Sequence, residues 1–110
     1  EWIDDTNTRV WRSIAWCSFL SHKFDVSQRY YQKILQNNPT SHDLLNAGHV
    51  ELAQGNMKDA MRYYSASIKE IKNIKSFKAL LRGDFKELEL LGVDLKIIPA
   101  LLDKIEYDLE

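Results

Sequence analysis

The residues that could bind a metal ion or act as a nucleophile are few, and their spacing argues against both roles. His42 and His49 lie seven residues apart, with Asp43 next to the first. Seven residues are about two helical turns, whereas paired metal ligands on one helix usually stand four apart. The single cysteine, Cys17, has no neighbouring base that would activate its thiol. We therefore expect surface or groove histidines, a small buried Cys17, no metal, no cofactor and no catalytic residue.

Composition narrows the class of protein further. The chain has 110 residues, which suit one domain, and its 45% hydrophobic and 28% charged residues match an ordinary globular protein. Fifteen basic and sixteen acidic side chains give a net charge of −1, which favours neither nucleic acid nor a membrane as partner. No apolar run is long enough to predict a membrane span. One cysteine excludes an internal disulfide, and we expect a cytoplasmic protein.

Most of the chain repeats apolar residues every three or four positions, which is typical of helices that bury one face. The clearest runs cover residues 11–19, 26–35, 44–53 and 60–74. Pro39 and Gly55 end the second and third runs, because each disfavours continued helix. Three shorter apolar stretches follow. Gly92 is expected to end the second of them, and Asp84 and Asp94 are expected to cap the last two helices. The sequence therefore predicts an all-α chain of short antiparallel hairpins.

The first two hairpins are similar to each other at a period of 33 residues, so that Tyr30-Tyr31 matches Tyr63-Tyr64 and Ala15 matches Gly48. The pattern resembles the tetratricopeptide repeat, whose unit has about 34 residues. The matching positions are Trp11, Ile14, Ala15, Phe24, Ser27, Tyr31 and Pro39 in the first unit, and Leu44, Ala47, Gly48, Gly55, Met57, Ala60 and Tyr64 in the second. Ser18, Glu51 and Lys72 depart from the family pattern.

This resemblance implies an α-α superhelix with a C-terminal helical cap. We expect residues 1–7 to end a preceding repeat, 8–40 and 41–75 to form the two hairpins, and 76–110 to form the cap, all in one domain. Small residues should bring Ala15 close to Ser27 and Gly48 close to Ala60. Stretches 98–103 and 107–110 resemble the closing segment of tetratricopeptide-repeat proteins from Bacteroides-type bacteria, so we expect a bacterial fragment that ends near a natural C-terminus.

In the family, the first helix of each hairpin lines a concave groove that binds a peptide or helix. The resemblance thus implies a non-catalytic protein-interaction scaffold. The groove residues would be Arg9, Arg12, Trp16, Phe19, His42, Leu45, Asn46, His49 and Leu52. Some family members hold a C-terminal carboxylate here; Arg12 and Asn46 match two such positions, and Lys78 or Arg82 could supply another cation.

Three alternatives stay open. The cap or upstream repeats could fill the groove, which would make the chain a structural end-cap whose binding surface lies upstream. A nucleic acid could bind the basic helix face of Lys58, Arg62, Lys69 and Lys72, within a stretch of seven basic and two acidic residues at 58–82. The chain could also self-associate through its N-terminal end, where Trp2, Val10 and Ile14 would lack partners.

Overall fold

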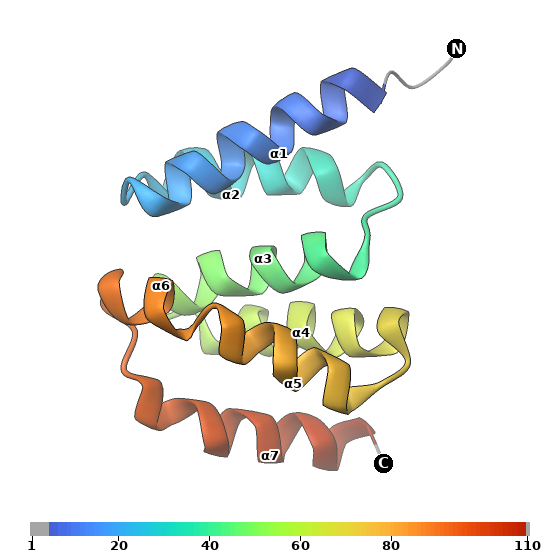
Figure 1. Ribbon diagram of the computed structural model, residues 1–110, viewed down its shortest axis with the longest axis vertical. Helices are drawn as coiled ribbons and strands as arrows, with labels where there is room; N and C mark the ends of the chain where they lie inside the picture. The colour runs from blue at the N-terminus through green and yellow to red at the C-terminus, as the bar shows by residue number, and fades with distance from the viewer. Residues whose placement is uncertain (1–4, 110) are drawn as a thin grey trace.

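The computed structural model describes residues 5–109, and side chains from 7 to 107; in this range it contains helices and no strand, which confirms the all-α prediction. The elements are α1 (Asp5–Leu20), α2 (Phe24–Leu35), α3 (Ser41–Ala53), α4 (Met57–Ile71), α5 (Ile74–Gly83), α6 (Phe85–Leu90), the 3-10 turn η1 (Leu95–Ile97) and α7 (Ile98–Leu109). Along the longest axis α1 and α2 come first, then α3 and α4, and then α7, while α5 and α6 lie at the level of α3 and α4 (Figure 1). No helix in the described part combines the length and apolarity needed to cross a membrane.

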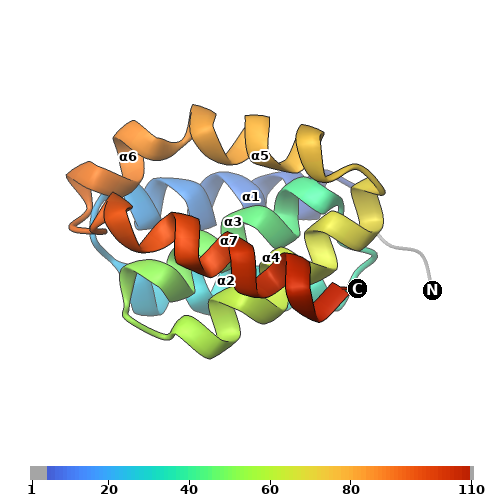
Figure 2. The same cartoon turned by 90° about the horizontal axis from the view of Figure 1, so that it is seen from below.

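The stack is built from antiparallel helix pairs. Hairpin 1 consists of α1 packed on α2, and hairpin 2 of α3 packed on α4; α2 also contacts α3 and so joins the two hairpins. Beyond hairpin 2, both α5 and α7 pack against α4. Seen from below, α5 and α6 run along one side of the stack, with α2 and α4 along the other (Figure 2). The C-terminal helices therefore pack against the end of hairpin 2, and we call them the cap.

Local signals fix several helix ends where the sequence places them. Thr40 forms a capping box with Asp43: its hydroxyl accepts from the Asp43 N–H at 3.1 Å, and the Asp43 carboxylate accepts from the Thr40 N–H at 3.0 Å. Gly55 and Gly92 adopt φ angles of +82° and +95°, a region that glycine reaches without strain. They close α3 and α6 as predicted.

Other helix ends differ from prediction. The fourth helix ends at Ile71 and not near Ile74, because Lys72 turns left-handed and Asn73 caps a new helix through the Lys75 and Ser76 N–H groups. Asp94 caps the 3-10 turn η1 and not α7 itself. Asp84 precedes α6 without any side-chain cap bond, because its carboxylate is bonded elsewhere, as described below.

Both expected close contacts involve buried small residues, and the structure shows what lies against Ala15 and against Gly48. The Ser27 hydroxyl donates to the carbonyl oxygen of Ala15 at 2.7 Å inside hairpin 1, which confirms that contact. In hairpin 2 the ring of Tyr64 covers Gly48, and a Cβ added there would lie 2.5 Å from Tyr64 Cε1. Tyr64 is one turn beyond Ala60, so the aromatic ring, rather than the small residue, dictates glycine at position 48.

Glu51 shows how a departure from the repeat pattern is accommodated. Its side chain is buried, yet it accepts hydrogen bonds from Gln28 Nε2 on α2 and from Asn56 Nδ2 in the turn before α4. A buried carboxylate is tolerated when such donors replace water. Glu51 therefore links the two hairpins.

Candidate functional site

A groove of about 320 Å³ lies between α1 and α3 and contains four of the nine predicted site residues: Arg12, Trp16, His42 and Asn46. Three further residues complete its lining, namely Tyr31, Thr40 and Asp43. We call this set the α1–α3 groove. The first helices of the two hairpins supply most of it, and Tyr31 reaches it from α2.

An internal ion pair organises one wall of the groove. Arg12 binds Asp43 through two parallel hydrogen bonds, Nε to Oδ1 and an Nη to Oδ2, each 2.8 Å long. Burial alone would raise the pKa of Asp43, but the bonds from Arg12 and Thr40 outweigh it and hold that pKa below its ordinary value. The carboxylate is thus charged at neutral pH, and the planar fork of Arg12 faces it in the bidentate geometry that suits this pair.

This pairing bears on the carboxylate-binding hypothesis. Arg12 already holds Asp43, and Lys78 Nζ lies 2.7 Å from Glu106 Oε1. A peptide carboxylate would have to compete with an internal carboxylate at either cation. The geometry therefore favours a ligand other than a C-terminal carboxylate.

The groove also contains an aromatic ring and a hydrogen-bond acceptor that has no partner. Trp16 is half-buried and packs at 5.4 Å, ring centroid to centroid, on Phe19 beneath it. The Oδ1 atom of Asn46 is buried and has no hydrogen-bond partner among the described residues. Leaving such an acceptor unpaired costs about 1–3 kcal/mol, so a ligand N–H that reached it would be favoured.

Tyr31 closes the groove from behind. Its hydroxyl is buried, and burial together with the negative charge of Asp43 raises the pKa of the phenol far above its usual value, although a hydrogen bond from Asn46 opposes the shift. The phenol is therefore protonated at neutral pH. It serves as a fixed polar group that orients the Asn46 amide.

Four predicted site residues are not accessible in the groove, and this corrects the prediction for them. Phe19, Leu45 and His49 have no exposed surface, and Leu52 is 4% exposed. They pack in the core that joins hairpin 1, hairpin 2 and the cap. The ninth predicted residue, Arg9, is exposed on α1 but does not line the groove.

His49 sits in a hydrogen-bonded chain that joins hairpin 2 to the cap. Its Nδ1 lies 2.7 Å from the Tyr64 hydroxyl and its Nε2 lies 2.9 Å from Asp84 Oδ2. An ionised carboxylate only accepts, so Nε2 carries the proton and donates to Asp84, while Nδ1 accepts from Tyr64. Burial lowers the pKa of His49 more than Asp84 raises it, so the imidazole is neutral at pH 7. The expectation of a surface or groove histidine holds for His42, which is exposed, and is wrong for His49.

Exposure of side chains also bears on the expectations for Cys17 and for the N-terminal end. Cys17 is exposed on α1, so the expectation of a buried cysteine is wrong. Val10 is 49% exposed and Ile14 is half-buried, whereas Trp2 lies outside the described residues. The expected end of a preceding repeat at residues 1–7 falls partly outside them too, and Asp5–Asn7 form the first turn of α1.

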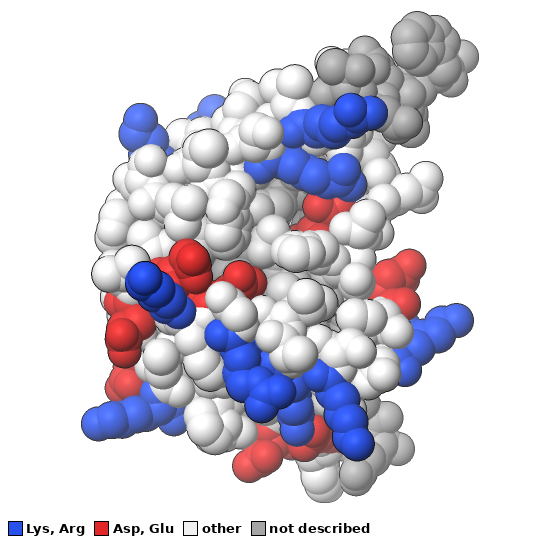
Figure 3. All heavy atoms as spheres, in the orientation of Figure 1, with Lys and Arg blue, Asp and Glu red and all other residues white. Residues whose placement is uncertain are grey.

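Basic side chains gather over α5 on the face shown in Figure 3.

No family model matches the chain, and no curated protein or solved structure gives a significant match. The functional argument therefore depends on the residues of the groove.

Proposed function

We propose that this chain is a tetratricopeptide-like α-α superhelix that binds a peptide segment of another protein in the α1–α3 groove, without catalysis. The 33-residue period, the stacked antiparallel hairpins and the close contact of Ala15 with Ser27 support the assignment. Because the one cysteine excludes an internal disulfide, we place the module in the cytoplasm. The proposal of a bacterial origin rests on the resemblance of 98–103 and 107–110 alone.

The observation that carries the proposal is the pairing of Trp16 with the unsatisfied Oδ1 of Asn46 in one groove. An extended peptide supplies a side chain for the indole face and, once the Asn46 side chain turns its amide oxygen toward the groove, a main-chain N–H for that oxygen. The groove lies on two rigid helices held in register by the Arg12–Asp43 pair. This pre-organisation lowers the entropy cost of binding.

One observation favours the structural end-cap as a second candidate. Three of the five predicted groove residues on hairpin 2 are buried, namely Leu45, His49 and Leu52, and Asp84 just before α6 bonds His49 directly. A cap that closes hairpin 2 leaves, of the predicted groove surface, the part that lines the α1–α3 groove. If that groove binds nothing, the end-cap function is the better description.

The test selects peptides from a random linear library on the 110-residue chain and measures their affinity by calorimetry. Trp16→Ala should weaken the selected peptides by about 2 kcal/mol, or about 30-fold. Tyr107→Ala is the matched control, because it removes an exposed aromatic ring from α7, outside the groove. His42→Ala, at an exposed edge of the groove, provides a second variant with little effect on folding.

Thermal melting by circular dichroism shows whether each variant is folded. Failure to enrich any peptide would contradict the proposal. Equal affinities for wild type, Trp16→Ala and His42→Ala would contradict it as well.

A further inference from the structure

A second and larger hollow, of about 690 Å³, lies between α4 and α7. It is lined by Met57, Lys58, Asp59, Met61, Arg62, Ser65 and Lys104, and we call it the α4–α7 groove. It shares no residue with the α1–α3 groove, so what it binds is independent of the function proposed above.

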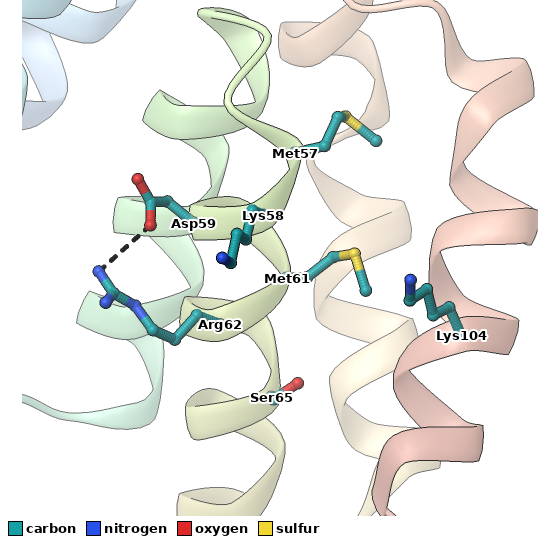
Figure 4. Close-up of a pocket in the computed structure, with 7 residues that line it drawn as sticks. All are labelled: Met57, Lys58, Asp59, Met61, Arg62, Ser65 and Lys104. Atoms are coloured by element: carbon teal, nitrogen blue, oxygen red, sulfur yellow. Dashed lines mark ion pairs between the residues drawn. The ribbon is translucent and has the colours of Figure 1, made fainter.

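The apolar part of this groove is formed by methionines. Met57 and Met61 are the only two methionines of the sequence, and they stand one turn apart on α4. Figure 4 shows both side chains directed toward α7. Ser65, a further turn along, is small and leaves the groove open at that end. Flexible, polarizable methionine side chains suit a surface that adapts to the apolar side chains of a partner.

Cations flank the methionines on both sides. Lys58 and Arg62 stand one turn apart on α4, and Lys104 extends from α7 toward Met61 (Figure 4). The one carboxylate in the lining, Asp59, lies 3.4 Å from Arg62, with both side chains largely exposed. Exposed pairs of this kind contribute little and exchange readily with an incoming carboxylate. The lining therefore keeps an excess of positive charge around an apolar centre.

We propose that the α4–α7 groove docks an acidic amphipathic helix of a partner protein. The apolar stripe of that helix would lie on Met57 and Met61, and its Glu or Asp residues would face Lys58, Arg62 and Lys104. Two of these cations, Lys58 and Arg62, also belong to the basic helix face of the nucleic-acid hypothesis, but nucleic-acid surfaces hold bases by stacking on aromatic rings. None of the seven lining residues is aromatic, and two methionines occupy the centre. The lining thus suits a helix with apolar and acidic faces.

The two methionines provide a direct readout. The full chain is labelled with ¹³C at the methionine methyl groups, and its two signals are assigned with Met57→Leu and Met61→Leu. The probe is a synthetic helix of about 15 residues, or four turns, with a leucine stripe flanked by glutamates. Both methyl signals should shift saturably as it is added, and the shifts should weaken with added salt. The same helix with lysine in place of glutamate should leave both signals unmoved.

Charge reversal on the chain locates the site. Lys58→Glu combined with Arg62→Glu should weaken binding of the acidic helix at least about tenfold. The matched control combines Lys72→Glu with Lys75→Glu, which make the same charge change at exposed lysines outside the groove and should alter affinity less than about twofold. Equal melting temperatures confirm that both double variants fold.

Four results would overturn the proposal. The acidic helix could leave the methyl signals unmoved, or the two double variants could weaken it equally. A single-stranded oligonucleotide could move the signals where the helix does not, which would assign the groove to nucleic acid. Methyl shifts that depend on chain concentration without any probe would assign it to a second copy of the chain.

Discussion

Positions 16 and 49 are equivalent in the 33-residue repeat, yet their side chains have opposite environments. Trp16 in hairpin 1 lines an open groove, whereas His49 in hairpin 2 is completely buried. The difference comes from the next unit along the stack. Beside Trp16 stand the polar side chains of α3, whereas over His49 the cap brings Asp84 within 2.9 Å. The repeat thus determines which face a residue occupies, and the neighbouring unit determines whether that face is accessible.

The tyrosines at positions 31 and 64 show the same principle. Both are buried on the second helix of their hairpin. Tyr31 receives a hydrogen bond from Asn46, on the hairpin that follows, whereas Tyr64 donates to His49 within its own hairpin. Equivalent phenols therefore position different partners: one supports the α1–α3 groove, and the other ties hairpin 2 to the cap.

The largest effect on stability is expected at position 48, where hairpin 2 has glycine and the equivalent position 15 of hairpin 1 has alanine. Gly48→Ala should lower the free energy of unfolding by about 1–3 kcal/mol, because the new methyl group collides with the Tyr64 ring. Alanine is the better helix former, so an effect of helix propensity alone would have the opposite sign. Urea denaturation measures the change.

Gly83→Ala is the matched control for that substitution, because nothing lies within 4 Å of a Cβ built at Gly83 and its φ is not positive. We expect it to leave stability unchanged or slightly raised. If Gly48→Ala were as stable as Gly83→Ala, the close packing of Tyr64 on α3 would be wrong.

A smaller effect is expected from the buried His49, which should make the free energy of unfolding depend on pH. Burial lowers the pKa of His49 in the folded chain. Below about pH 6.5, His49 is therefore protonated in the unfolded chain while it stays neutral in the folded chain. The free energy of unfolding should therefore fall as the pH drops below that value, by at most about 1.4 kcal/mol per pH unit from this one group. Denaturation midpoints between pH 8 and pH 5 measure the slope.

Substitution identifies the group responsible for that slope. His49→Gln should reduce it, whereas His22→Asn should retain it, because His22 is exposed and its φ of +62° is one that asparagine tolerates. A slope that persists in His49→Gln would assign the pH dependence to another group. Asp43, whose pKa is also lowered in the folded chain, adds a loss of stability only in stronger acid.

Much of the fold could be predicted from the sequence because its signals are local. Apolar periodicity located the helices, and Gly55 and Gly92 marked two of their ends. The 33-residue period identified the equivalent positions and the contact of Ala15 with Ser27. The break at Lys72 was missed because a left-handed lysine has no distinctive sequence signal.

The site was predictable only in part, because its accessibility depends on contacts distant in sequence. Arg12, Trp16, His42 and Asn46 follow from the resemblance to the repeat family, but Tyr31, Thr40 and Asp43 were missed. The Thr40-x-x-Asp43 spacing does indicate a capping box, which would have drawn attention to Asp43. Nothing local indicates that Asp43 binds Arg12, 31 residues away, or that Asp84 covers His49, 35 residues away.

The most direct test compares the reactivity of a single thiol at the two equivalent positions. In a Cys17→Ser background, Trp16→Cys and His49→Cys each carry one cysteine, and a colorimetric disulfide reagent reports its rate of modification under native conditions. We predict fast modification at position 16 and modification at least about 100-fold slower at position 49, because reaction there requires the cap to open. Similar rates of modification at both positions in folded protein would contradict the claim that position 16 is accessible and position 49 is covered by the cap.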